Sequence, residues 1–187
     1  MDFSKYIKDF DNDSIYYGDK NFITNSQLGK LSHSPAKLEH YRKWGQDDTN
    51  ALLFGRAFHQ NILEPEKYKE QVMSYDGTRR GKAWDEFKSS NDDKTIITKG
   101  EEKSLLKMRE KLYSIPRVVG LLSGGEAEIV SCWEDSDTGV YCKGKTDYVK
   151  EENGRKILVD IKTTQDHSQR AFMGSCYKYG YDRQSAF

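Results

Sequence analysis

The stretch Lys156-Ile157-Leu158-Val159-Asp160-Ile161-Lys162-Thr163-Thr164 decides how the rest of the chain is interpreted. Its apolar, β-branched core predicts a short buried strand, which ends with a carboxylate and an ammonium group two residues apart. Because side chains alternate across a strand, Asp160 and Lys162 share one face with Leu158. The opposite, apolar face consists of Ile157, Val159 and Ile161. The acid and the base therefore point the same way.

A strand that carries an acid and a base to one spot has two interpretations. Burying a lone charge is costly, so the two groups either pair with each other or hold a metal and a substrate. The pattern Asp-x-Lys is weak by itself, because acid-x-Lys also occurs at residues 86–88, 92–94 and 101–103. None of those triplets follows an apolar, strand-like run, so the context of Asp160 and Lys162 is what favours a site.

Length and composition predict one well-solvated domain over residues 1–187. The chain has 35% hydrophobic and 32% charged residues, and 30 basic residues balance 30 acidic ones. A nucleic-acid surface must therefore come from local segregation of charge. No run of about 18 apolar residues or signal peptide appears, which favours a cytoplasmic protein without membrane partners. The cysteines are few, odd in number and widely spaced, which predicts reduced packing residues: Cys132, Cys142 and Cys176.

The first half of the chain reads mostly as helices. Residues 1–23 are acidic and aromatic and are interpreted as an extended N-terminal arm, and residues 66–78 as irregular. Capping residues predict helices that begin after Thr24, Ser34, Thr49 and Thr98. The last of these helices contains Lys103, Lys107, Arg109 and Lys111, which are distributed around it and establish no single phosphate-facing stripe.

The period changes from helical to alternating near residue 126. Strands are predicted at residues 126–133, 140–149 and 156–162, joined by polar turns at residues 135–139 and 151–154, and helix returns at residues 168–187. This order predicts an antiparallel three-strand meander. Strand alternation places Lys145, Asp147 and Val149 on one face of the middle strand.

Pairing across the turn at residues 151–154 can bring Asp147 and Asp160 close together on one face. Two neighbouring carboxylates repel unless a cation sits between them. Mg²⁺ suits such oxygen ligands and keeps positions for water and phosphate oxygens. With Lys162 beside it, this set can activate a water and stabilise charge on a phosphate.

His59 lies one helical turn after Gly55 on the predicted helix at residues 49–64. One interpretation is a half-buried core histidine. The other is that Gly55 lets a second element approach closely while His59 reaches into a shared site.

Five motifs in order carry a family resemblance. They are residues 55–59 (GRAFH) with 63–65 (LEP), 145–147 (KTD), 160–164 (DIKTT) and 179–187 (YGYDRQSAF). Together they resemble the RecE-type phage and prophage exonucleases of the PD-(D/E)xK superfamily. The resemblance runs from about Thr24 to the last residue. It implies an α/β (α+β) fold with a restriction-endonuclease-like core, in which a central mixed sheet with the antiparallel meander is flanked by helices.

The resemblance also implies an activity. The expected enzyme is a Mg²⁺-dependent exodeoxyribonuclease, with Mn²⁺ able to substitute, that digests one strand of linear duplex DNA from the 5′ end. The 3′ overhang would serve recombination by a single-strand annealing protein. The implied partners are duplex ends, that annealing protein and further copies of the chain in a ring, in the cytoplasm of a bacterium that carries the phage or prophage.

Site residues follow from the same motifs. The implied metal ligands are His59, Asp147, Asp160, the Ile161 carbonyl and Glu128, with Glu126 as a rival to Glu128. Lys162 would position or help to deprotonate the attacking water. Gln184 matches the glutamine of the family's Gln-x-x-x-Tyr motif and would contact a phosphate or the lysine. The expected DNA contacts are the basic turn with Arg79, Arg80 and Lys82, which is otherwise a solvated surface, and Thr163 and Thr164.

The chain departs from the family pattern at two points. Thr146 replaces the proline of the "PD" motif, which leaves the carboxylate chemistry intact. The sequence stops at Phe187, one residue before the expected tyrosine, so we expect a C-terminus that is truncated relative to the family. One alternative is a Cas4- or AddB-like nuclease, although such proteins commonly carry an iron–sulfur cluster on four cysteines and this chain has three. The other is a catalytically impaired module that binds DNA or a partner.

Overall fold

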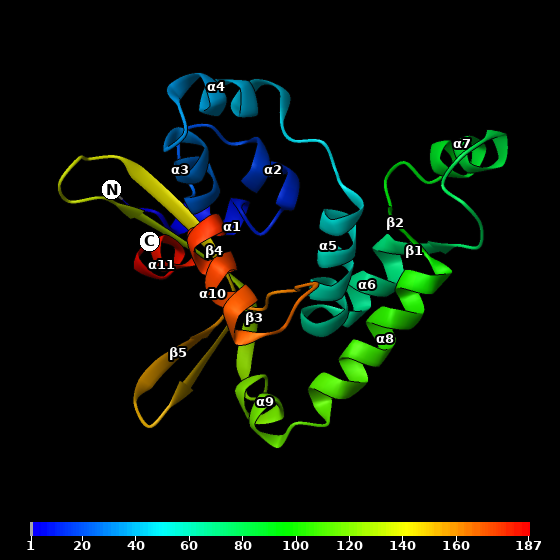
Figure 1. The fold of residues 1–187 in the computed structure, drawn as a ribbon. Coiled ribbons are helices and arrows are strands. Elements are labelled where there is room, and N and C mark those ends of the chain that lie inside the picture. The colour runs from blue at the N-terminus through cyan, green and yellow to red at the C-terminus, as the bar shows by residue number, and fades with distance from the viewer. Residues whose placement is uncertain (1) are drawn as a thin grey trace. The chain divides into compact units, whose positions relative to one another are not determined.

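A computed structural model describes residues 2–187, which form helices and two small sheets (Figure 1). The larger sheet is antiparallel and contains, in this order, β3 (Gly125–Glu134), β4 (Tyr141–Glu152) and β5 (Arg155–Val159). The smaller sheet pairs β1 (Val72–Tyr75) in parallel with β2 (Thr95–Thr98). The predicted α/β class with an antiparallel three-strand meander is therefore confirmed. No helix within residues 2–187 has the length and apolar character needed to cross a membrane.

The chain divides into two compact units. Unit 1 comprises Met1–Asp47, Ile129–Thr146 and Thr164–Phe187, and unit 2 comprises Asp48–Glu128 and Asp147–Thr163. The boundaries fall inside β3 and β4 and after β5, so each unit contains part of the larger sheet. That residues 1–187 form a single domain stays a prediction.

Unit 2 packs its helices around an aliphatic and aromatic core. It contains α5 (Asn50–Leu63), α6 (Pro65–Gln71), α7 (Lys82–Ser89), α8 (Lys99–Tyr113) and α9 (Pro116–Leu121). The core consists of Ala57, Phe58, Ile62, Ile97, Leu105 and Ile161. As predicted, Thr49 begins α5 by accepting the backbone N–H of Leu52, and a capping box of Thr98 and Glu101 begins α8. These caps fix where each helix begins, and the apolar positions along it determine which face turns inward.

The β4–β5 hairpin contains the start of the stretch Lys156–Thr164 and leads into the rest of it. Its tight turn has positive φ at both Asn153 (53°) and Gly154 (72°), the conformation of the type I′ hairpin turn. The strand ends at Val159, earlier than predicted, but the alternation continues beyond it. Ile161 is buried, whereas Asp160 and Lys162 are exposed and the side chain of Leu158 is 67% exposed. The predicted division into two faces is correct.

Unit 1 corrects one expectation. It contains α1 (Ser4–Asp9), α2 (Asp13–Gly18), α3 (Asn25–Leu31), α4 (Pro35–Trp44), α10 (Gln169–Tyr179) and α11 (Tyr181–Ala186). The extended arm predicted for residues 1–23 is wrong over α1 and α2; Met1 lies outside the described residues. The Asn12 side chain caps α2 by accepting two backbone N–H groups, and burial of Phe10, Tyr16 and Phe22 holds both helices in place.

Candidate metal centre

Three side chains of unit 2 converge from three elements. They are His59 from α5, Glu128 from β3 and Asp147 from β4, all half-buried, and their candidate ligand atoms lie within 4.8 Å of one another. His59 Nδ1 is 3.6 Å from Asp147 Oδ2. These three residues are distant in sequence, so the fold of unit 2 is what brings one imidazole and two carboxylates together.

Asp147 is a half-buried carboxylate of this group, with a side chain that is 15% exposed. Its Oδ2 accepts the backbone N–H of Ile161 at 2.6 Å. Burial raises the pKa of Asp147; His59, the Ile161 hydrogen bond and Lys162 oppose that rise, and the charge of Asp160 adds to it. The net effect is a raised pKa, so the protein's own groups compensate this anion incompletely.

Glu128 adopts a backbone conformation that is unusual for its residue type. Its φ is 56°, in the left-handed region, although it lies within a strand. For a residue with a Cβ this conformation costs about 1–2 kcal/mol, and such outliers cluster at functional sites. Glu126, the rival acidic residue, is exposed on the same strand. The structure thus brings Glu128, not Glu126, to His59 and Asp147.

Asp160 lies next to this group without belonging to it. Its two carboxylate oxygens are 2.7 and 2.6 Å from Lys162 Nζ. The hairpin pairs Tyr148 with Val159, and continuing that register by one residue sets Asp147 opposite Asp160 on the same face. The influence of Asp160 on the pKa of Asp147 agrees with this proximity. Asp147, Asp160 and Lys162 therefore lie close together, as expected, and the Asp160 carboxylate forms an ion pair with Lys162.

A close approach also joins α5 to the segment after β5. A Cβ built on Gly55 would lie 3.5 Å from Thr163 Oγ1. The second interpretation of Gly55, that it admits another element one turn before His59, agrees with this contact. Ile161 anchors the same segment, because its side chain is part of the core and its N–H binds Asp147.

The structure does not bring the predicted DNA contacts and Gln184 together into one group. Arg79 is bound within unit 2, with its guanidinium 2.6 and 3.1 Å from the Glu101 carboxylate and 3.1 Å from the Ile96 carbonyl. Arg80 is exposed, and Lys82 is exposed with its Nζ 3.6 Å from Glu86. Thr164 and Gln184 are exposed residues of unit 1.

The donor set fits a divalent cation. Ligands about 2.0–2.1 Å from an octahedral ion lie roughly 3–4 Å from one another, close to the observed spread. Carboxylates suit Mg²⁺ and Mn²⁺, and an imidazole also suits the transition metals. A cation would add positive charge beside Asp147, which His59 and Lys162 compensate only in part. His59, Glu128 and Asp147 could therefore hold such an ion, with Asp160 alongside.

Comparison with known families adds a sequence relationship. The model of a family described as a PDDEXK-like domain of unknown function (DUF3799) matches residues 24–187. The matched region includes His59, Glu128, Asp147, Asp160 and Lys162, and residues 1–23 lie outside it. No curated protein matches the chain. PDDEXK nucleases generally use divalent metals, and the match supports a nuclease.

Proposed function

Because the chain belongs to this PDDEXK-like family, we propose that it is a metal-dependent nuclease and, more narrowly, an exodeoxyribonuclease acting on linear duplex DNA. The observation that carries the proposal is the convergence of His59, Glu128 and Asp147 within 4.8 Å, next to Asp160 and Lys162. A purely structural charge cluster would be internally compensated, whereas Asp147 has a raised pKa and an incomplete set of partners.

The residues divide into an ion-holding set and a water-orienting set. His59, Glu128 and Asp147 hold the ion, for which we propose Mg²⁺, with Mn²⁺ as a substitute. The bound ion supplies a Lewis acid that lowers the pKa of water and offsets charge on the phosphoryl group. Lys162 orients the attacking water and balances charge that develops on the phosphate, and Asp160 fixes the ammonium through their contacts of 2.6–2.7 Å.

The finer assignment rests on the five motifs that resemble RecE-type exonucleases. On that basis we propose digestion from the 5′ end, leaving a 3′ overhang for a single-strand annealing protein in phage recombination. Ring-shaped oligomers and a role for Gln184 near the scissile phosphate belong to the same proposal. We propose that Arg80 and Lys82 contact DNA phosphates away from the scissile bond, since both residues are exposed.

The test is digestion of linear duplex DNA labelled at either the 5′ or the 3′ end, in Mg²⁺, Mn²⁺ or EDTA. We expect release of the 5′ label that requires the ion and is abolished by Asp160→Ala. The matched control is Asp137→Ala, which removes an exposed aspartate in the β3–β4 turn of unit 1 and should leave activity unchanged. Covalently closed circular duplex tests the need for an end and should remain intact.

The outcomes separate the levels of the proposal. Ion-dependent cleavage of the circle would support a nuclease and refute the exonuclease. Release of the 3′ label first would reverse the polarity. Equal activity of Asp160→Ala and the native protein, or activity that persists in EDTA, would refute the assigned site.

A further inference from the structure

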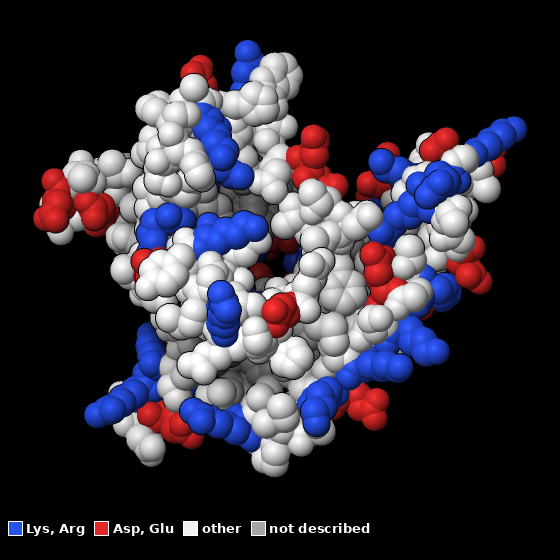
Figure 2. Space-filling view, in the orientation of Figure 1, with Lys and Arg blue, Asp and Glu red and all other residues white. Residues whose placement is uncertain are grey.

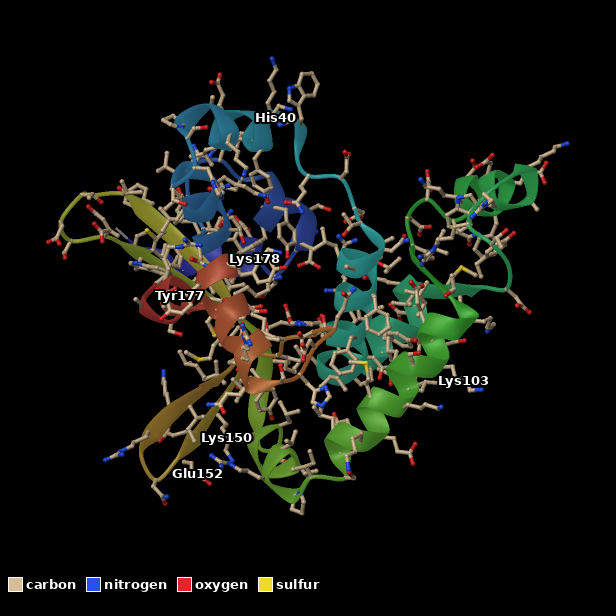
Figure 3. All side chains as sticks on the ribbon, viewed as in Figure 1. His40, Lys103, Lys150, Glu152, Tyr177 and Lys178 are labelled. Atoms are coloured by element: carbon tan, nitrogen blue, oxygen red, sulfur yellow. The ribbon has the colours of Figure 1, made fainter. Side chains whose placement is uncertain are left out.

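Three lysines form a regular row on the outer side of α8. Lys103, Lys107 and Lys111, which we call the lysine stripe, recur every four residues and are all exposed. Four residues of helix rise about 6 Å, so the ammonium groups follow one another at short, even intervals. Figure 2 shows basic side chains gathered along α8, and in Figure 3 the side chain of Lys103 extends away from the helix.

The stripe lacks the ion pairs that other helical lysines of unit 2 make. Within residues 2–187, none of its three ammonium groups forms an ion pair or hydrogen bond with the chain. Glu110 lies three residues after Lys107, yet forms no ion pair with it. By contrast, four lysines on helices of this unit pair with an acid three or four residues away: Lys67, Lys69, Lys82 and Lys99. The stripe thus accumulates uncompensated positive charge in a chain whose net charge is zero.

The core of unit 2 fixes the direction in which the stripe points. Leu105 is fully buried in the cluster that also contains Phe58 and Ile161. Arg109 turns away from the stripe, half-buried, with its guanidinium 5.6 Å from the centre of the Tyr113 ring. The basic residues that the sequence spread around the helix are therefore divided, with one arginine packed and three lysines in a row. Because α8 shares its core with α5 and the segment after β5, it belongs to the same unit as the metal centre.

We propose that the lysine stripe binds the phosphate backbone of duplex DNA. The identity of this polyanion rests on the proposed function, whereas the need for an anionic partner rests on the unpaired charges. Like charges four residues apart destabilise a helix, so the arrangement is unfavourable until an anion covers it. Duplex DNA carries one negative charge per about 1.7 Å of axis, which suits a row of closely spaced ammonium groups.

The experiment measures binding without cleavage. Anisotropy of a fluorescent blunt-ended duplex in EDTA is recorded over a series of salt concentrations. The test variant carries Lys103→Gln, Lys107→Gln and Lys111→Gln together, because glutamine has nearly the helix propensity of lysine. We expect affinity to fall at least about tenfold at low salt and the slope of log K against log salt to become shallower by about 2–3, since each phosphate contact contributes about 0.9.

Two matched variants make the result specific. Lys5→Gln, Lys8→Gln and Lys20→Gln remove the same charge from exposed positions of unit 1 and should keep the native slope. Replacing the three stripe lysines by arginine keeps their charge and should restore the slope. Equal slopes in the stripe variant and the native protein, or an equal loss in the control variant, would overturn the proposal. A loss on single strands without a loss on duplex would also overturn it.

Cleavage distinguishes this inference from the proposed function. If the native protein cleaves DNA and the stripe variant keeps the native salt slope, the inference fails and the nuclease stands. If no ion supports cleavage but the stripe variant loses its slope, the nuclease fails and the duplex-binding surface stands. An unchanged or higher melting temperature of the stripe variant shows that its binding defect is not misfolding.

Discussion

Lys143 in unit 1 and Asp147 in unit 2 are both charged residues of β4, and the chain surrounds the two charges differently. Lys143 in unit 1 is 1% exposed, yet its ammonium contacts the Tyr16 carbonyl at 2.5 Å and Asp19 Oδ1 at 3.3 Å. It also lies over aromatic rings, with centroid distances of 4.2 Å to Phe10 and 4.7 Å to Tyr16. Burial lowers the pKa of Lys143, and Asp19 opposes that change. This cation is enclosed by partners from the chain itself.

Asp147 in unit 2 is half-buried, with a side chain that is 15% exposed, and has no comparable set of partners among the described residues. His59 is 3.6 Å away, one backbone N–H binds it, and Asp160 and Glu128 bring further negative charge. A buried charge that the chain neutralises serves the fold, whereas one that the chain leaves partly uncompensated favours a cation from solution. The contrast between Lys143 and Asp147 therefore separates a structural charge from one that we propose to bind a metal ion.

The largest effect is expected from breaking the structural charge. Lys143→Ala removes the ammonium and leaves Asp19 and the Tyr16 carbonyl without their partner, so unit 1 should lose about 3–5 kcal/mol of unfolding free energy. Urea denaturation followed by circular dichroism measures this loss. Lys20→Ala, at the exposed position that follows Asp19, should change stability by less than about 0.5 kcal/mol. A loss below about 1 kcal/mol in Lys143→Ala would mean that the aromatic enclosure does not depend on the cation.

The functional charge should respond to metal instead. An ion at 100 times its dissociation constant stabilises the native state by about 2.7 kcal/mol, and Asp147→Asn should lose most of that gain. Thermal melts of the native protein and the variant, with Mg²⁺ or Mn²⁺ and with EDTA, measure the difference. Asp137→Asn is the control and should gain as much as the native protein. Equal gains in native protein and Asp147→Asn would place the ion elsewhere.

In EDTA, a smaller and pH-dependent effect should distinguish the same two proteins. A carboxyl whose pKa is raised on folding favours the native state while protonated, and this contribution is lost as pH rises through the native pKa. The native protein should therefore match Asp147→Asn near pH 4 and become progressively less stable than it toward pH 7. Melting temperatures across this range test the sign. If the melting temperature of the native protein instead rises relative to that of Asp147→Asn as pH increases, the chain itself compensates the Asp147 charge without metal.

These charges also show what the sequence could and could not reveal. The two faces around Asp160 and the Asn153-Gly154 turn follow from local alternation and turn chemistry, which are encoded within a few residues. The environment of Lys143 is not local, because its partners come from residues 10–22. Residues 1–23 have little periodicity of their own, so the sequence predicts an extended arm there. The helices form because Phe10, Tyr16 and Phe22 are buried together.

The same distinction applies to the sheets and the metal centre. β1 and β2 have four residues each and pair in parallel, with α7 in the connection between them. The pairing partner of β1 is therefore distant in sequence, and the prediction that residues 66–78 are irregular is wrong over α6 and β1. The motif spacing indicated His59, Glu128 and Asp147, which the fold brings together. Local alternation leaves open whether Asp160 pairs with Lys162 or holds a metal. The structure shows the pair, through both carboxylate oxygens, because the outcome depends on side-chain geometry beyond the end of β5.

The strained backbone of Glu128 gives a further test of a functional charge. Relative to Glu128→Ala, which removes the same carboxylate, Glu128→Gly relieves a left-handed conformation that costs about 1–2 kcal/mol and loses about 0.5–1 kcal/mol in chain entropy. Without metal it should therefore be more stable than Glu128→Ala by up to about 1.5 kcal/mol. Metal-dependent stabilisation should fall at the same time. Glu126→Gly, on the same strand without positive φ, should instead lose about 0.5–1 kcal/mol and keep the metal response. A Glu128→Gly variant that is less stable than Glu128→Ala would mean that the left-handed backbone is not strained.

The smallest effect concerns charges that are neither buried nor paired. Lys107 stands between Lys103 and Lys111, so Lys107→Gln removes two like-charge contacts and should stabilise unit 2 by a few tenths of a kcal/mol at low salt. Screening should abolish the gain near 1 M salt. Lys69→Gln breaks an ion pair of 2.7 Å with Glu66 and should give no gain, which makes it the control in the same melts. Lys143 is paired within the chain, and Asp147 is the metal ligand that we propose. A gain confined to Lys107→Gln would identify a third class of charge, which is exposed, repelled by its neighbours and suited to the anionic partner that we propose.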